Sequence, residues 1–383
     1  MIKRNDWIER IEKALETRTI IWLAGVRRVG KTTLCQSLEN IEYFDCELPR
    51  IRRQMEDPQD FLDSLHGKRV VLDEIHRLPN PSELLKIAAD HYPDVHIIAT
   101  GSSSLGASSK FGDTLTGRKR DIWLTPMTFQ DMVEFENTLI PHRMLHGGFP
   151  YFFMEKTPPE AEFQEWMDAY WSKDIQELFR LERKFSFQRF VELLLLNSGG
   201  VFEATKYATP CEISRTTITN YLSVLSETYV AHVIKPFNTH RANEIVSAPK
   251  IYAFDTGFVC AFRGWLSWRP EDYGILWEHL VLNELQATLP RKSIRYWRDK
   301  RGHEVDFVIT GHNSNTPTAI ECKWSADGFH SRGLTAFRRL YPDGNNIIVA
   351  HDVDMPYKRT IKGIPVTFHS LQTISQALQN PTP

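Results

Sequence analysis

The sequence has almost no net charge, because 46 Lys and Arg residues oppose 48 Asp and Glu residues and leave a formal charge of −2. This excludes a polycation that binds nucleic acid along its whole length, but a local basic groove remains possible. Cysteines are also few: there are five, and no two of them form a C-x-x-C pair. The chain therefore shows no disulfide framework, which favours a reducing compartment.

Long apolar runs are missing as well. The longest run near the middle of the chain, residues 191–196, is interrupted by Glu192 and is far too short to cross a bilayer. The first residues, MIKRNDWIERIEKAL, are charged and amphipathic, without the apolar segment of a signal peptide. We therefore expect a soluble, cytoplasmic protein. Its 383 residues, 42% of them hydrophobic, suit two or three folded domains.

A phosphate-binding pattern lies near the start of the chain. Residues 18–24 are apolar and predict a strand, and a helical apolar pattern begins at Leu34. Between them stands GVRRVGKTT, a G-x-x-x-x-G-K-T motif in the context it requires. The residues that we expect to bind the nucleotide here are Gly25, Arg27, Arg28, Gly30, Lys31, Thr32 and Thr33.

The residue types of this motif match the chemistry of a nucleotide phosphate. Glycines let backbone N–H groups wrap phosphate oxygens, and a helix N-terminus adds its positive dipole end. Lys31 would reach the β- and γ-phosphates, and Thr32 would offer its hydroxyl to Mg²⁺. The pattern predicts ATP and Mg²⁺ as cofactors. A glycine-rich turn with an exposed lysine is the alternative, which the flanking segments disfavour.

A second apolar run, RVVLDE, ends in two carboxylates. We expect Asp73 to hold Mg²⁺, directly or through water, and Glu74 to polarise the attacking water. A third apolar run, residues 96–100, leads into a Ser-rich turn, where Thr100 and Ser102 are candidates to contact the γ-phosphate or the attacking water. A solvated strand end and a plain turn are the structural alternatives.

Arg118 lies in the segment LTGRKR, ahead of a predicted strand at residues 122–124. It is a candidate arginine finger that acts on the nucleotide of a neighbouring subunit. That role would require a homo-oligomer. A solvated arginine, or one that faces DNA, remains an open alternative.

Four runs together resemble one family: GVRRVGKTTL, VVLDEIHRLP, IIATGSSSL and LTGRKRDIWLTPMTFQDMVEF. They are similar to prokaryotic AAA-type P-loop ATPases that carry a C-terminal restriction-endonuclease-like, PD-(D/E)xK domain of unknown function. The resemblance extends over nearly the whole chain. It implies an α/β protein with an AAA-type P-loop ATPase domain and its parallel sheet at 1–140, a helical and winged-helix connector at 141–240, and a nuclease-like α/β domain at 241–383.

The middle of the chain has the order of a winged helix. Helical patterns at residues 187–197, 203–208 and 215–225 precede a strand-like run at 231–234. The third helix carries Arg215 as its only cation, so the electrostatic basis for DNA contact is thin. DNA contact and a purely structural or subunit-packing role both remain open.

The last third carries a candidate metal site. Three strand-like runs at residues 294–298, 304–309 and 318–323 contain Asp306 and the triplet Glu321-Cys322-Lys323. Because side chains alternate along a strand, Glu321 and Lys323 point to the same side. This D…E-x-K arrangement is similar to the metal signature of restriction endonucleases. We expect Asp306 and Glu321 to share Mg²⁺ while Lys323 orients the water.

Two further carboxylates could complete this cluster: Glu278, on a predicted helix at 276–285, and Glu304. The D…E-x-K spacing is loose when taken alone. A nuclease relic, in which Glu321 and Lys323 form an ion pair, is therefore the alternative to a working site. A group of cations with interleaved aromatic residues precedes Asp306 and suits a DNA backbone or a solvated hairpin: Arg291, Lys292, Arg295, Arg298, Lys300 and Arg301.

These patterns lead to one functional hypothesis and one alternative. The hypothesis is an ATP-hydrolysing protein that acts on DNA, with nucleotide-gated DNA binding and Mg²⁺-dependent phosphodiester cleavage by the C-terminal domain. The alternative is a catalytically inactive nuclease-like domain that recognises DNA or protein within an ATP-dependent adaptor or defence switch.

Overall fold

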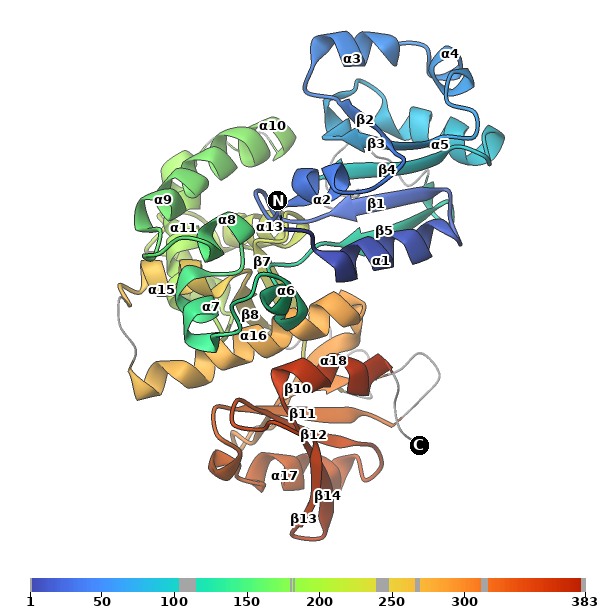
Figure 1. The fold of residues 1–383 in the computed structure, drawn as a ribbon. Helices are drawn as coiled ribbons and strands as arrows, with labels where there is room; N and C mark the ends of the chain where they lie inside the picture. Colours follow the sequence, from blue (N-terminus) through green and yellow to red (C-terminus); the bar gives the residue numbers. More distant parts are fainter. Residues whose placement is uncertain are drawn as a thin grey trace.

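The structure is a computed structural model that describes residues 2–102, 115–179, 181, 183–238, 248–265, 269–310 and 316–379. Figure 1 shows an N-terminal sheet with its helices, a helical middle part, and a C-terminal sheet beneath the long helix α16 (Tyr273–Thr288). The chain is thus an α/β protein, as predicted. Within the described ranges, no helix combines the length and the apolar content that a membrane crossing needs.

The N-terminal sheet is parallel throughout and has the strand order β2-β3-β4-β1-β5. Its strands are β1 (Ile20–Ala24), β2 (Glu42–Asp45), β3 (Arg69–Asp73), β4 (His96–Gly101) and β5 (Lys119–Trp123). Its helices are α1 (Asn5–Leu15), α2 (Lys31–Gln36), α3 (Pro49–Gln54), α4 (Pro58–Asp63), α5 (Pro81–His91) and α6 (Phe129–Glu134), with a 3₁₀ turn at Ile75–Arg77. The central strands are buried along nearly their whole length, as expected of a parallel sheet with both faces covered.

The middle part is mostly helical and includes a small antiparallel sheet of order β6-β8-β7. Its helices are α7 (Ile140–His146), α8 (Pro150–Phe153), α9 (Glu160–Ala169), a π-helical turn (Tyr170–Ile175), α10 (Gln176–Phe179), α11 (Lys184–Leu196), α12 (Ala204–Ala208), α13 (Arg215–Glu227) and α15 (Thr256–Phe262). Its strands are β6 (Gly200–Val201), β7 (Ala231–Ile234) and β8 (Lys250–Ala253). The order α12, α13, β7 is the one expected of a winged helix. Strand β8 completes this sheet from beyond residue 240, and the boundary drawn there stays a prediction.

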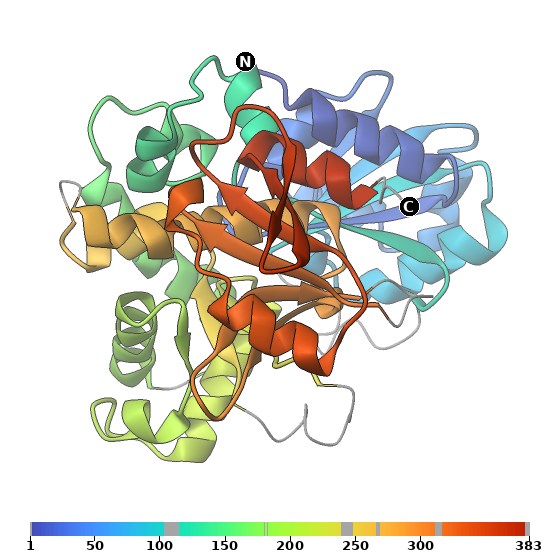
Figure 2. The ribbon, with the colours of Figure 1, turned by 90° about the horizontal axis from the view of Figure 1, so that it is seen from below.

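The C-terminal sheet is mixed, with the order β13-β14-β12-β11-β10-β9. Its strands are β9 (Ile294–Arg298), β10 (Glu304–Ile309), β11 (Thr318–Lys323), β12 (Asn346–Ala350), β13 (Tyr357–Ile361) and β14 (Ile364–His369). Helix α17 (Arg332–Leu340) packs against β10. Helix α16 contacts β11, and α18 (Leu371–Gln379) contacts β12 and β14. The view in Figure 2 shows α17 and α18 on different sides of this sheet. Short 3₁₀ turns lie at Pro270–Asp272, Arg291–Ser293 and Ala326–Gly328.

Helix α16 joins the C-terminal sheet to the rest of the molecule. Trp277 donates its indole N–H to the carbonyl of Val349 in β12, at 2.9 Å. Farther along the helix, the amide of Asn283 donates to the carbonyl of Pro126, at 3.0 Å, just before α6. The carboxylate of Glu284 accepts the backbone N–H of Phe129, at 2.6 Å. One contiguous apolar core accordingly includes side chains from all three parts.

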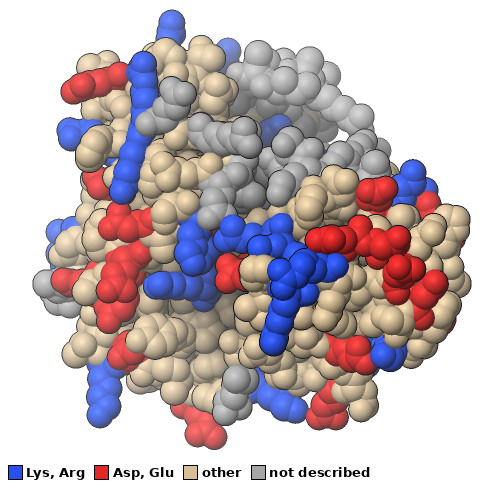
Figure 3. All heavy atoms as spheres, turned by 90° about the horizontal axis from the view of Figure 1, so that it is seen from above, with Lys and Arg blue, Asp and Glu red and all other residues tan. Residues whose placement is uncertain are grey.

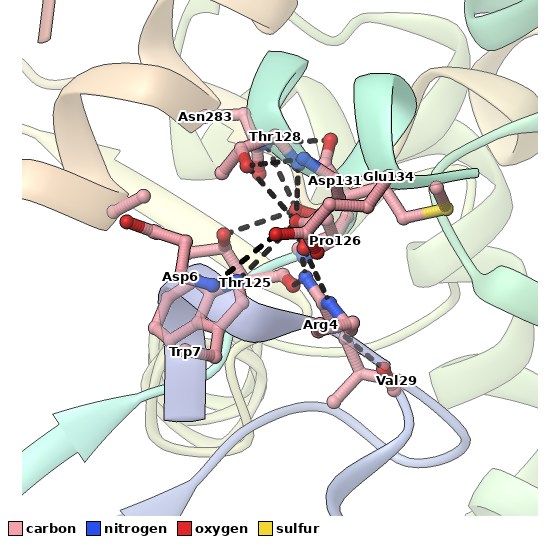
Figure 4. Close-up of polar contacts among 12 residues, drawn as sticks. Arg4, Asp6, Trp7, Val29, Thr125, Pro126, Thr128, Asp131, Glu134 and Asn283 are labelled. Carbon is pink, nitrogen blue, oxygen red and sulfur yellow. Dashed lines mark hydrogen bonds and ion pairs between the residues drawn. The ribbon is translucent and has the colours of Figure 1, made fainter. Parts of the chain in front are cut away.

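A buried ion pair anchors the start of the chain (Figure 4). Arg4 donates to both oxygens of Asp131, from Nε at 2.7 Å and from Nη2 at 2.6 Å. Arg4 also donates to the carbonyl oxygens of Val29 in the phosphate-binding loop and of Thr125, both at 3.2 Å. Burial by itself would raise the pKa of Asp131, but Arg4 and Thr128 hold that pKa below its ordinary value. The pair is therefore charged at neutral pH.

We predict that Asp131→Asn lowers the free energy of unfolding by about 3–5 kcal/mol, because it leaves the Arg4 charge buried without its partner. Denaturant unfolding at neutral pH measures this change. Glu39→Gln is the control, since the Lys3–Glu39 pair is exposed and its loss should cost about 0–1 kcal/mol. Equal stability of the two variants would contradict the role assigned to Asp131.

Candidate functional site

The G-x-x-x-x-G-K-T segment forms a loop between β1 and α2. A Cβ atom at Gly25 would lie 2.6 Å from the carbonyl oxygen of Leu124, so a larger residue would force the loop away from the end of β5, where Leu124 follows directly. Gly30 has a φ of 104° directly before α2, which a glycine adopts without strain. Arg28, with a φ of 63°, adopts a left-handed conformation that is rare for a non-glycine residue. The glycines of the motif thus stand where the backbone of the loop requires them.

Lys31 begins α2 and is 95% buried, with its ammonium turned back into the loop. It donates to the carbonyls of Gly25, at 2.8 Å, and Val26, at 3.2 Å. Burial lowers the pKa of Lys31, while the nearby carboxylates of Glu74 and Asp174 raise it. A bound phosphate would offer Lys31 charged acceptors in place of two neutral carbonyls.

Three hydroxyl groups hold the carboxylate of Asp73 at the end of β3. Thr32 donates to it at 2.8 Å, and Tyr43 from β2 and Thr100 from β4 also donate to it. Thr100 in addition accepts the backbone N–H of Glu74, at 3.0 Å. A hydroxyl and a carboxylate are hard oxygen ligands of the kind that Mg²⁺ prefers, so Thr32 and Asp73 fit the predicted ion. Thr100 reaches the site through Asp73.

Glu74 follows β3 in a left-handed conformation, with a φ of 52°. Its carboxylate lies 3.1 Å from Nδ1 of His76. Burial would raise the pKa of Glu74, but the His76 hydrogen bond and the charge of Lys31 lower it to about 2. Glu74 is therefore ionised at neutral pH and can accept a hydrogen bond from water. So low a pKa suits a residue that orients water better than one that removes its proton.

A cavity of about 710 Å³ opens over these residues. The predicted nucleotide residues that line it are Arg27, Arg28, Gly30, Lys31, Thr32, Thr33, Asp73 and Glu74. The middle part supplies another side of the same cavity, with Phe149, Tyr151, Phe152, Glu162, Glu165 and Lys173. A nucleotide bound here would touch both parts of the molecule.

Ser102 and Arg118, the remaining candidates, lie apart from this lining. Ser102 is buried and hydrogen-bonds to Asp174 of the π-helical turn, while the rest of its predicted Ser-rich turn lies outside the described residues. Arg118 precedes β5, whose first residue pairs with Ile20 at the start of β1, so it lies at the end of the sheet opposite the phosphate loop. There it donates to Asp90, at 2.6 Å. An arginine finger at Arg118 would have to act in trans, and this role remains a prediction.

Sequence reasoning missed several residues around the nucleotide cavity, among them Tyr43, His76, Lys173 and Asp174. Tyr43 holds Asp73, His76 contacts Glu74, Lys173 lines the cavity and Asp174 pairs with Arg27 at 3.4 Å. His76 could have been suspected, because it stands two residues after Glu74. The others belong to no motif, and only the folded chain brings them to the site.

The C-terminal candidates form an acidic cluster at the junction of α16 and β10. Glu278, Glu304 and Asp306 each place one carboxylate oxygen within 4.8 Å of the others. Three such oxygens suit Mg²⁺ or Mn²⁺, so this donor set fits the expected ion. Glu321 lies beside this group on β11, where the pairing of Phe307 with Ile320, continued by one residue, sets it opposite Asp306.

Two lysines neutralise part of the cluster. Lys323 lies 2.8 Å from Glu321 and 3.4 Å from Asp306, as the predicted role near both carboxylates requires. Lys250, from β8 of the middle part, contacts Glu304 and lies 3.7 Å from Glu278. Sequence reasoning missed Lys250, because it belongs to a different sheet and precedes the motif by more than fifty residues.

The cations expected to form a DNA track do not act as one group. Arg291 is half-buried, with its guanidinium 5.0 Å from the ring centre of Trp123 and 4.9 Å from that of Tyr229. It belongs to the packing between the parts, and its place in the track was wrong. Lys292, Arg298 and Lys300 are exposed, as such a track requires. Trp297, one of the interleaved aromatic residues, is buried in the core next to Phe337.

Comparisons with known proteins divide the chain into three matches. Residues 17–133 match the family described as "AAA domain", and this range includes the phosphate loop, Asp73 and Glu74. The match over residues 17–133 supports a P-loop ATPase family. Residues 137–269 and 273–368 match two domains of unknown function, DUF8612 and DUF4143. The function supported for the ATPase part is nucleotide binding and hydrolysis, for which Mg²⁺ is the usual ion.

Several relatives share most of the chain. An uncharacterized protein of Mycobacterium tuberculosis is 26% identical over 347 residues, which is 87% of this chain and 77% of the relative. One of Methanocaldococcus jannaschii is 24% identical over 344 residues, 79% of this chain and 75% of the relative. The Walker-type ATPase PABY2304 of Pyrococcus abyssi aligns in structure with 69% of this chain and 96% of its own, at 16% identity and a TM-score of 0.44.

We predict that Glu74→Gln lowers ATP turnover by about 100-fold or more while nucleotide binding is retained, because the amide no longer offers a charged acceptor to the attacking water. Phosphate release and binding of a fluorescent ATP analogue measure the two effects. Glu83→Gln, at an exposed position of α5, is the matched control and should turn over ATP normally. Normal turnover in Glu74→Gln would remove this residue from the mechanism.

We also predict that Mn²⁺ binds the acidic cluster more tightly as the pH rises from about 6 to about 9. Burial, together with the negative charge of Asp306, raises the pKa of Glu278 to about 8 and that of Glu321 to about 7. Protons therefore compete with the ion until both carboxylates ionise. Calorimetric titration without nucleotide measures this, with Asp306→Asn to subtract other sites. An affinity that does not change, or that falls with pH, would contradict it.

Proposed function

We propose that the chain is an ATPase that acts on DNA, in which ATP binding gates DNA engagement and the C-terminal cluster cleaves a phosphodiester bond. The observation that carries the proposal is the convergence of Glu278, Glu304 and Asp306 within 4.8 Å, with Lys323 3.4 Å from Asp306. Three carboxylates beside a lysine are the groups that metal-assisted hydrolysis of a phosphodiester needs.

Each part of the cluster has a separate task in this proposal. The carboxylates of Glu278, Glu304 and Asp306 would hold Mg²⁺, which supplies Lewis-acid stabilisation of the phosphate. Lys323 would orient the water and offset negative charge at the phosphate. Glu321 would share the ion, as the sequence predicts, and lies 2.8 Å from the ammonium of Lys323.

Although the net charge of the chain is close to zero, its local groups of cations favour a nucleic-acid partner. Arg298, Lys300 and Arg301 are exposed at the end of β9 and in the turn that leads to the acidic residues of β10. Elsewhere, Figure 3 shows Lys and Arg side chains gathered near the middle of one face, with acidic side chains on both sides. Exposed cations such as Arg298, Lys300 and Arg301 attract a phosphate backbone at short range, where charges more than about 10 Å away are largely screened.

One observation favours the alternative of an inactive, recognition-only domain. The ammonium of Lys250 already contacts Glu304 and lies 3.7 Å from Glu278, so the cluster has two lysines for its four carboxylates. Ion pairs of this kind can stabilise a domain that no longer binds a metal. The adaptor would then use ATP to control binding of DNA or protein.

A cleavage assay separates the two. We predict that the protein cuts linear, single-stranded or branched DNA with ATP and Mg²⁺ or Mn²⁺, and that Lys323→Ala lowers cutting by about 100-fold or more. Lys31→Ala should change cutting through the ATPase. Lys206→Ala is the control, because this exposed lysine forms a local pair with Glu203, at 2.9 Å, far along the chain from the cluster.

Other outcomes identify the alternatives. Salt-dependent DNA binding with ATP hydrolysis but without cutting would support the adaptor. The absence of any salt-dependent DNA affinity would favour a switch that acts on protein partners. An arginine finger at Arg118 would add a homo-oligomer to either case, and a strict monomer in the presence of an ATP analogue would exclude it.

A further inference from the structure

An ion pair connects the phosphate loop to the middle part. Nη1 of Arg27 lies 3.4 Å from Oδ2 of Asp174 in the π-helical turn. Asp174 is 98% buried, whereas the side chain of Arg27 keeps 23% exposure toward the cavity. The Nε atom of Arg27 is buried and has no hydrogen-bond partner among the described residues. Arg27 thus lines the cavity and has one donor that no described residue accepts.

The same two residues contact several parts of the nucleotide site. The indole of Trp166 in α9 donates to the carbonyl of Arg27, at 2.9 Å. The hydroxyl of Ser102, after β4, hydrogen-bonds to Asp174. Lys173, next to Asp174 in the turn, lines the cavity. A movement of Arg27 would thus alter its contacts with both α9 and the π-helical turn.

The charges around Asp174 make this pair sensitive to an incoming anion. Burial raises the pKa of Asp174, and Arg27 and Ser102 counteract that rise. Glu74 and Lys31 are also close enough to influence this carboxylate. A phosphate offers a guanidinium more negative charge than one carboxylate does, and it can accept two parallel hydrogen bonds.

We propose that the Arg27–Asp174 pair senses the terminal phosphate, so that ATP draws Arg27 away from Asp174 and displaces the π-helical turn with the helices on either side of it. This rests on ATP binding at the phosphate loop. Once Arg27 turns to the phosphate, Asp174 is left as a buried charge without its main partner, beside a new anion. Movement of the turn relieves that cost. ADP lacks the terminal phosphate and leaves the pair closed.

The first test compares Asp174→Asn with the wild-type protein. We expect Asp174→Asn to bind AMP-PNP about tenfold more tightly, because it removes both the competitor for Arg27 and a repelling charge. The affinity for ADP should change much less. Asp168→Asn is the matched control, since Asp168 lies on α9 but is exposed and pairs with Lys184 at 3.6 Å.

A double-mutant cycle identifies Arg27 as the group through which Asp174 acts. In an Arg27→Ala background, Asp174→Asn should no longer tighten AMP-PNP binding. An undiminished effect in that background, or equal tightening for ADP and AMP-PNP, would overturn the sensing role. Absence of AMP-PNP binding by the wild-type protein would instead refute the nucleotide site itself.

Hydrogen exchange reports the movement directly and needs no variant. We expect AMP-PNP, but not ADP, to increase exchange in peptides from residues 160–179 of the wild-type protein. In Asp174→Asn this difference between the nucleotides should vanish. The same exchange with AMP-PNP and with ADP in the wild type would overturn the proposal, even if Asp174→Asn failed to fold.

Discussion

The buried ion pair between Arg4 and Asp131 fixes the frame in which the nucleotide site is held. Arg4 donates two hydrogen bonds to the carboxylate and one each to the carbonyls of Val29 and Thr125. One side chain thereby sets the distance between the phosphate loop and the segment that leads to α6. Since both side chains are buried, removing either charge would leave the other one desolvated and unpaired, at a large cost in stability.

That frame continues into the C-terminal part through α16. The segment between β5 and α6, which Arg4 fixes at Thr125, presents the carbonyls of Pro126 and Met127 to Asn283. The same helix carries Glu278, about a turn and a half earlier, into the acidic cluster. The phosphate loop and the cluster are therefore connected by short polar contacts and one rigid helix. A displacement of the phosphate loop therefore has a continuous structural route to the acidic cluster.

Sequence predicted the elements whose signals are local. Strand β3, which ends in Asp73, and strands β10 and β11, which contain Asp306 and Glu321, are apolar runs of ordinary strand length. Each of them carries its site residues within the run or at its end. Contributions from distant elements left no such signal. Lys250 reaches the acidic cluster from another sheet, and Arg291, which has the composition of a DNA contact, is enclosed between aromatic rings because the parts pack there. Burial of a cation by tertiary packing cannot be seen in a local charge pattern.

The middle part shows what this difference means for function. The sequence predicts a connector here, and the helix predicted at residues 215–225 has Arg215 as its only cation. In the folded chain it supplies one wall of the nucleotide cavity and, through Asp174, a buried charge that faces the phosphate loop. A buried carboxylate is costly to keep unless its partner stays in place, so the position of the middle helices depends on where Arg27 is. The middle part, which the sequence predicts as a connector, therefore contains the buried pair whose interaction energy would change when a phosphate binds the loop.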